Sequence, residues 1–580
     1  MKNRLGGITK YLPVPPDPPW RNFLVLSLIL ATCLFFVAGY VAEETPGYYW
    51  DYVTYYDQLR EIRDEVGSGD WPRFLETLIL TRGSDYNLSP AIPLLPIYLI
   101  ASLSRLTYIL GLVIIYLIPA TIVLVLIIQE CWKDSGRRIS FFLALGLVLL
   151  YPMFWAPTLR GYADVAALIP MGLAGLILFR TRWILQASLK QALFIGIFLY
   201  CTFLLRRHYA YSIVSIISIS YLFAGWSLVF TPSRREFFLK RLARNSFFAG
   251  LAMLVPALII QGPLVQRIVT TSYKSVYIAY QKGFLEKLLD IYAQNGPFWV
   301  FLVGCGCLYA IYLRNSKLLF CLATGVLSYA LFQSTQAPYI HHTLPFYFWL
   351  APLAAWPLTY IESQPTAIRR AGLGALLLGF ASVVSLPSLA WSDITRSPLF
   401  SWSKPIQATD RFPPFRLKSY PALKKLVEEL ESPEYANKRI FVLASSFEFN
   451  PSILRSLSPE LAPRILDGGD VDLRDGFSVA KALNADFIVT TRKPALHLPM
   501  QHQQVIVIPN RALLDSASPL GKSFTANPEK TYDLSDGNKV YILRRVSSLS
   551  PEDISWLTAK FRESYPSWRL KDGVIGPVQP

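Results

Sequence analysis

Long apolar runs that recur from residue 22 to residue 391 constrain this 580-residue chain more than any other feature. A helix needs roughly 20 apolar residues to cross a bilayer core of about 30 Å. Charged residues make up 16% of the chain, against about 25% in an average soluble protein, and the deficit lies before residue 391. The sequence therefore predicts a polytopic α-helical membrane protein, with a transmembrane domain over 1–391. We expect eleven spans, at 22–41, 108–129, 139–156, 163–179, 191–205, 209–230, 246–264, 297–313, 318–333, 341–361 and 371–391.

The remaining residues, 392–580, have the composition of an ordinary soluble domain. Strand-like runs are predicted at 439–445, 486–491, 504–509 and 539–546, with helical patterns at 419–431 and 477–484. Such alternation is typical of a small α/β domain.

The positions of the basic residues predict the orientation of the spans. With the N-terminus inside, the cytoplasmic segments contain 19 basic and five acidic residues, whereas the first outer loop contains four basic and ten acidic residues over 42–90. This is the positive-inside bias, and it explains most of the net charge of +17 without a nucleic-acid partner. Residues 91–103 are apolar but short and contain two prolines, so we interpret them as a re-entrant or interfacial segment. The first outer loop then covers 42–107, another covers 265–296, and the C-terminal domain lies outside.

Charged side chains at a membrane face are costly and are candidates for function. Asp51 lies in the segment GYYWDYVTYYDQ of the first outer loop, which also carries Asp57. A carboxylate among apolar rings can act as a general base. Aromatic faces also suit sugar rings, and the candidates for stacking are Tyr49, Trp50 and Tyr55. The alternative is an interfacial aromatic belt with a solvated Asp.

Basic and acidic groups at the outer ends of later spans are predicted to join this segment. Arg160 and Asp164 are four residues apart in TLRGYAD, so they form either a local ion pair or part of a site with a second carboxylate. The cations Arg206, Arg207 and His208 suit a lipid phosphate, although snorkelling to headgroups is the alternative. His341 and His342 begin the tenth span, as a phosphate-binding pair or as a helix cap.

These features together resemble the GT-C glycosyltransferases. The motifs are a first span, an outer loop that opens with Asp among aromatics, a short Pro-containing piece, and R-G-Y-A-D after the third span. Within that superfamily the chain is similar to the protein O-mannosyltransferase and lipid A aminoarabinose transferase group. The resemblance implies that Asp51 is the catalytic carboxylate and Asp164 the second acidic residue. The usual Asp-Glu pair is absent because Tyr52 follows Asp51, so Asp57 remains an alternative base.

The resemblance further implies phosphate-binding roles for Arg206, Arg207 and a histidine. The expected reaction is inverting transfer of a sugar from a polyprenyl-phosphate donor to an extracytoplasmic acceptor, which is a glycan, lipid or protein. A divalent cation such as Mg²⁺ or Mn²⁺, held by Asp51 and Asp164, is a further expectation. The expected location is a bacterial inner membrane, with the C-terminal domain periplasmic. The alternatives are a lipid-linked glycan flippase and an O-antigen polymerase or ligase.

Overall fold

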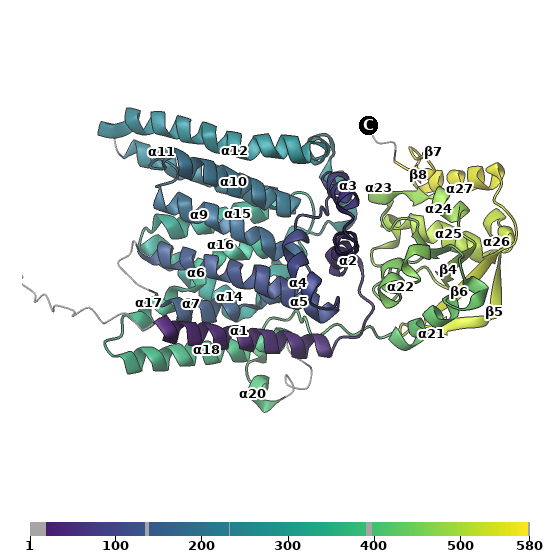
Figure 1. The fold of residues 1–580 in the computed structure, drawn as a ribbon, viewed down its shortest axis with the longest axis horizontal. Coiled ribbons are helices and arrows are strands. Elements are labelled where there is room, and N and C mark those ends of the chain that lie inside the picture. The colour runs from purple at the N-terminus through teal and green to yellow at the C-terminus, as the bar shows by residue number, and fades with distance from the viewer. Residues whose placement is uncertain (1–18, 134–138, 231, 390–396, 578–580) are drawn as a thin grey trace, which may run out of the picture.

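The computed structural model describes residues 19–133, 139–230, 232–389 and 397–577. It consists of a body of roughly aligned helices and an α/β domain beyond one end of that body (Figure 1). Two short helices, α2 (Thr54–Gly67) and α3 (Trp71–Thr81), lie between the two parts. Each helix of the body is apolar over most of its length. Its backbone polar groups are satisfied by the hydrogen bonds within the helix, as a bilayer requires.

Eight of the described helices are long and apolar enough to cross a membrane, which makes the chain an integral membrane protein. A ninth crossing is formed if α7 (Phe141–Leu149) and α8 (Pro152–Leu159), bent by 54°, count as one span. The two other predicted spans are shorter helices: α10 (Leu189–Leu205) has 17 residues, and the tenth is divided into α16 (Leu344–Ala354) and α17 (Trp356–Glu362). The eight helical segments are α1 (Pro19–Ala42), α5–α6 (Arg105–Lys133), η4–α9 (Ala163–Arg180), η5–α11 (Arg207–Val229), α12 (Arg235–Thr270), α14 (Phe284–Tyr312), α15 (Ser316–Gln333) and α18 (Ala367–Leu389).

Residues 91–103, predicted to be a re-entrant or interfacial segment, form only one short turn and one short helix. Residues 91–103 contain the 3-10 turn η2 (Ile92–Leu94) and the six-residue helix α4 (Leu95–Ile100). Six residues of helix rise about 9 Å, far less than the bilayer core. The neighbouring helix α3 buries none of its residues within the protein and exposes Trp71, Leu75 and Ile79. Its apolar face is therefore free to lie in the membrane interface.

A glycine allows the third predicted span to meet the first outer loop. The helix α8 ends at Leu159, and Gly161 then adopts φ +92°. A Cβ atom at Gly161 would lie 2.5 Å from the carbonyl oxygen of Tyr52 and 2.6 Å from the Nη1 of Arg105. Only glycine fits both the left-handed conformation and this close approach. The turn carries the chain into the 3-10 helix η4 (Ala163–Ala167), which holds Asp164.

The C-terminal domain is an α/β domain, as predicted. Its main sheet has the strand order β2-β1-β4-β6-β5. The first three strands, β2 (Ile465–Asp467), β1 (Ile440–Leu443) and β4 (Phe487–Thr491), are parallel, whereas β6 (Lys539–Arg545) and β5 (Phe524–Asp533) are antiparallel. A small second sheet joins β3 (Phe477–Ser478), β8 (Val574–Gly576) and β7 (Arg569–Lys571). The larger helices of the domain are α21 (Tyr420–Leu430), α22 (Pro451–Leu457), α25 (Gln504–Leu514) and α27 (Pro551–Ser564).

One predicted strand of this domain is wrong. Residues 504–509 begin the helix α25, although their run of Val and Ile favours a strand by propensity. The carboxylate of Asp472 accepts hydrogen bonds from the backbone N–H groups of Gln504 (2.9 Å) and Val505 (2.8 Å). A carboxylate there satisfies N–H groups that a helix start leaves free. This long-range cap and burial of Val505, Ile506 and Val507 override the local preference.

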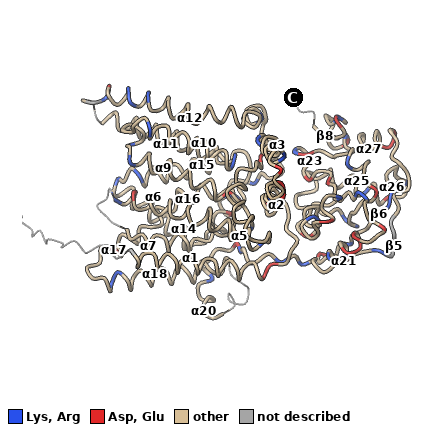
Figure 2. The backbone as a smooth tube through the Cα atoms, viewed as in Figure 1, with Lys and Arg blue, Asp and Glu red and all other residues tan. Residues whose placement is uncertain are grey.

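Charge is distributed unequally along the helical body. Figure 2 shows that Lys and Arg gather at the end of the body that is remote from the α/β domain. Among them are Arg235, Arg241 and Arg244 of the first turns of α12, and Lys317 at the start of α15. Acidic residues occur mainly in α2 and the α/β domain (Figure 2).

Candidate active site

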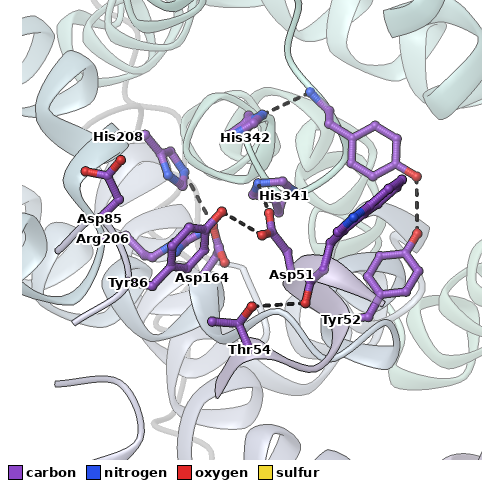
Figure 3. Close-up of polar contacts among 12 residues, drawn as sticks. Asp51, Tyr52, Thr54, Asp85, Tyr86, Asp164, Arg206, His208, His341 and His342 are labelled. Carbon is purple, nitrogen blue, oxygen red and sulfur yellow. Dashed lines mark hydrogen bonds and ion pairs between the residues drawn. The ribbon is translucent and has the colours of Figure 1, made fainter. Parts of the chain in front are cut away.

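Asp51 lies at the point where the first outer loop meets the ends of the spans (Figure 3). It belongs to the 3-10 turn η1 (Trp50–Tyr52), and the preceding Trp50 has φ +48°, a conformation that is uncommon for a non-glycine residue. Tyr86 Oη donates to the Oδ1 of Asp51 at 2.6 Å, and the Nε2 of His341 lies 3.8 Å from the Oδ2. The side chain of Asp51 is 27% exposed. It is thus fixed from two sides and still open to a substrate.

Burial and the Asp51 carboxylate together hold the pKa of Tyr86 well above its ordinary value. The phenol therefore stays protonated at neutral pH and acts as the donor of the 2.6 Å bond. This bond fixes the orientation of the Asp51 carboxylate.

The second carboxylate, Asp164, is sealed inside the protein with 0% exposure. Arg206 Nε donates to its Oδ1 at 2.9 Å, and the Nε2 of His208 lies 3.5 Å from the same oxygen. Tyr209 Oη donates to the backbone oxygen of Asp164 at 2.9 Å. A buried carboxylate needs such a partner, because an unpaired charge in this environment is very costly.

Arg206 connects the two carboxylates through aromatic residues. Its Nη1 donates to Tyr55 Oη at 2.9 Å. Its guanidinium carbon also lies 5.0 Å from the ring centre of Tyr86, within the range of a cation–π contact. Tyr86 therefore contacts Arg206 with its ring and Asp51 with its hydroxyl, and so connects the two residues.

Three histidines form one wall of the site. The ring centres of His341 and His342 are 3.8 Å apart, and that of His208 lies 5.0 Å from His342. His341 stacks on Tyr162 of the R-G-Y-A-D motif, with a centroid distance of 4.1 Å and an interplanar angle of 16°. His342 Nδ1 accepts a hydrogen bond from the backbone N–H of Tyr339 at 3.1 Å. Stacking thus orients His341 toward Asp51.

Arg207 lies at the edge of the site and is more accessible than Arg206. Its Nη2 lies 3.0 Å from Asp85 Oδ2 and donates to Tyr277 Oη at 2.9 Å. Asp85 also pairs with Arg267, near the end of α12. The side chain of Arg207 is 20% exposed, against 5% for Arg206. Arg207 and Arg267 can therefore meet a ligand from outside, whereas Arg206 is enclosed.

The structure brings most of the predicted residues together, but Arg160 and Asp57 have other partners, and two of the predicted stacking rings are enclosed. Arg160 makes no ion pair with Asp164 among the described contacts, and instead donates to the carbonyl of Pro413 at 2.9 Å. Asp57 accepts a hydrogen bond from Arg60 at 2.8 Å. Tyr49 and Tyr55 are buried, so neither ring offers a free face for a sugar, while Trp50 is half-buried at the domain junction.

Two residues of the site were not predicted from the sequence. Tyr86 and Asp85 lie in the segment GSDYNLSP of the first outer loop, and they contact Asp51 and Arg207 respectively. The signal that could have found them is the tyrosine beside an acidic residue in a polar stretch just before the short apolar segment 91–103. Nothing local in the sequence indicates that this stretch folds back over η1.

The donor set does not fit a divalent cation at Asp51 and Asp164. Among the residues that the structure describes, no three His, Cys, Asp or Glu side chains are grouped so that they could hold an ion. Arg206 already supplies positive charge to Asp164 at 2.9 Å. Hard cations need several oxygen ligands, and Asp164 Oδ1 is occupied by cationic and imidazole nitrogens instead.

No family model matches the chain, and no curated protein matches it. The crystal structure of ArnT from Cupriavidus metallidurans in the apo state aligns over 90% of this chain and 98% of that chain, with 11% identity and a TM-score of 0.47. ArnT is a lipid A aminoarabinose transferase.

Proposed function

We propose that this protein is an inverting membrane glycosyltransferase that transfers a sugar from a polyprenyl-phosphate donor to an extracytoplasmic acceptor. The observation that carries the proposal is the placement of Asp51. It is an accessible carboxylate, held by Tyr86 and His341 above the buried Asp164–Arg206 pair.

Asp51 is the proposed general base. The acceptor hydroxyl gives its proton to the carboxylate, and its oxygen forms a new bond to the anomeric carbon of the donor. The bond between that carbon and the phosphate oxygen breaks, and its electron pair stays with the departing lipid phosphate. Attack opposite to the leaving group inverts the anomeric centre. A positioned base contributes about 10²–10⁴-fold to such a reaction.

Cationic groups beside Asp51 are proposed to stabilise the leaving phosphate. Arg207 and Arg267 are accessible and share the carboxylate of Asp85, so a phosphate that replaces Asp85 would meet two guanidinium groups. His341 lies 3.8 Å from Asp51 and supplies an imidazole at the same depth. Preorganised positive groups aimed at developing negative charge usually make the largest contribution to catalysis. Arg206 acts in this scheme by holding Asp164 and Tyr55.

The distribution of charge supports an extracytoplasmic site. Lys and Arg gather at the end of the helical body remote from the α/β domain (Figure 2), and the positive-inside rule assigns such an end to the cytoplasm. The site and the α/β domain then lie outside, periplasmic in a bacterium with an inner membrane. A polyprenyl chain would remain in the bilayer while its phosphate reaches Arg207 at the headgroup level.

A donor assay with purified protein tests this function. We expect transfer from a synthetic short-chain polyprenyl-phosphate sugar, read out by mass spectrometry of the released lipid phosphate and of the product. The corresponding nucleotide sugar, offered without lipid, is expected to give no product. Asp51→Asn serves as the matched inactive control. Turnover of the nucleotide sugar by the lipid-free protein would refute the proposed donor class.

A further inference from the structure

One edge of the parallel part of the sheet in the α/β domain contacts the segment that contains Asp51. Strands β2, β1 and β4 run in the same direction, so the segments that follow them, near Phe447 and His497, lie at one edge. These segments contact the membrane domain: the ring centre of Trp50 lies 5.5 Å from that of Phe447 and 4.5 Å from that of His497. In sheets of this kind, ligands bind outside the carboxyl ends of the strands.

His497 is held in a defined orientation at this edge. Its Nδ1–H donates to the carbonyl of Ser445 at 2.8 Å, and Gln503 Oε1 accepts from its backbone N–H at 2.9 Å. Burial lowers the pKa of His497 to about 4. At neutral pH the Nε2 atom is therefore an acceptor, and the hydroxyl of Tyr280, 3.4 Å away, is its donor. These contacts fix the imidazole against the ring of Trp50.

Exposed aromatic rings flank the same place. Phe447 is 52% exposed and Tyr339 is 47% exposed. The Tyr339 hydroxyl lies 3.2 Å from that of Tyr52, which directly follows Asp51. These two accessible rings lie near a partly open carboxylate, so they offer apolar faces to a ligand of Asp51.

We propose that the rings of Trp50, Tyr339 and Phe447 form an acceptor subsite that binds a carbohydrate. This inference rests on the proposed function and names the class of its acceptor. The negative faces of aromatic rings attract the C–H groups of a sugar, and His497 orients the ring of Trp50. Because Trp50 precedes Asp51 in the chain, a sugar held here presents another hydroxyl to the proposed base. The α/β domain thereby selects the acceptor while the membrane domain performs the chemistry.

Binding of simple sugars to the full-length protein in lipid nanodiscs tests the subsite without any donor. The probes are the methyl glycosides of glucose, galactose, mannose and N-acetylglucosamine, observed by saturation-transfer NMR. We expect transfer to the ring C–H protons of at least one glycoside. Phe447→Leu, which keeps an apolar side chain but removes the ring face, is expected to reduce that signal at least ten-fold. Phe447→Tyr should retain it, because the ring is preserved.

Trp402→Leu is the control for nonspecific contact between sugars and aromatic rings. Trp402 is 54% exposed and packs against Phe380 of α18, so its loss should leave the signal unchanged. The subsite is overturned if Phe447→Leu binds the glycosides like the wild type, or if none of the glycosides gives a signal with the wild type. Because no donor is present, glycoside binding that depends on Phe447 would support the subsite even if the donor assay failed.

Discussion

The hydroxyl of Tyr86 donates to the carboxylate of Asp51 at 2.6 Å, across 35 residues of the first outer loop. The same tyrosine ring lies over Arg206, which pairs with Asp164. One side chain thus contacts both the accessible carboxylate and the cation that neutralises the buried one. This relationship distinguishes the roles of the two acidic residues: Asp51 is open to substrate, and Asp164 is enclosed.

Asp51→Asn is expected to lower turnover by at least about 100-fold, on the scale of a lost general base. Asparagine keeps the size of the side chain and can still interact with Tyr86, so membrane yield should hardly change. The matched control is Asp57→Asn, because Asp57 pairs with Arg60 outside the cluster. Steady-state turnover of the lipid-linked donor measures both. A larger loss in the Asp57 variant would reverse the assignment of the base.

Tyr86→Phe is expected to lower turnover by about ten-fold or more, on the scale of a lost hydrogen bond to a charged group of about 1.5–3 kcal/mol. The substitution removes only the hydroxyl, so Asp51 loses the donor that orients its carboxylate. The ring over Arg206 remains, and the thermal midpoint of the protein should change little. The measurement is steady-state turnover of the lipid-linked donor by both proteins. Equal turnover would show that Tyr86 does not position the base.

The convergence of the site could be predicted because topology places its parts on one membrane face. Asp51, Asp164, Arg206 and His341 all follow or precede apolar runs at the same side, and the structure brings them together. Their pairing could not be predicted. Arg160 lies four residues from Asp164, yet the turn at Gly161 separates them, and Arg206 becomes the partner from 42 residues away.

Secondary structure and contacts could not be predicted from local sequence where residues distant in the chain determine them. The Val–Ile run at 504–509 favours a strand, but Asp472 caps it as a helix. Tyr86 gives no periodic or motif signal, because its role depends on how the first outer loop folds back. The aromatic residues near Asp51 stand out in the sequence as a group, but only the structure shows that Tyr49 and Tyr55 are buried while Phe447, from the other domain, is exposed.

Topology can be tested with single cysteines in a cysteine-free background. Arg511 and Met500, which are exposed, represent the α/β domain. We expect a membrane-impermeant thiol reagent to label cysteines at these two positions in cells whose outer permeability barrier is opened. Cysteines at Arg235 and Arg369 should react only after lysis. Labelling at position 235 before lysis would invert the assignment.

Acidification is expected to destabilise the α/β domain through His497. Its pKa is about 4 in the folded protein, against about 6.5 in an unfolded chain. The unfolded state therefore binds more protons between these values, and stability is complete above about pH 6.5 and decreases as the pH falls toward 4. The loss amounts to roughly 2–3 kcal/mol at the lower end.

His497→Gln should flatten this dependence. Thermal unfolding of the full chain at pH 7.5 and pH 5 measures the effect as a difference between the variant and the wild type. Asp470, whose pKa is raised to about 6 mainly by burial, contributes with the opposite sign. Its contribution is common to both proteins and cancels in that difference. Equal pH dependence in the two proteins would contradict the assignment to His497.

Arg206 and Arg207 are adjacent in sequence, but substitution by Gln should reduce stability at Arg206 and donor use at Arg207. Arg206→Gln leaves Asp164 as an unpaired buried carboxylate, so we expect destabilisation of about 3–5 kcal/mol and a lower thermal midpoint. Arg207→Gln removes a group at the edge of the site, where Asp85 can still pair with Arg267. Its stability should be close to that of the wild type, whereas donor use should weaken by about 1.5–3 kcal/mol, the range for a hydrogen bond to a charged group.

Thermal unfolding and the KM for the lipid-linked donor, measured on both variants, separate the two roles. A stable Arg206 variant with weakened donor binding would instead place Arg206 on the phosphate.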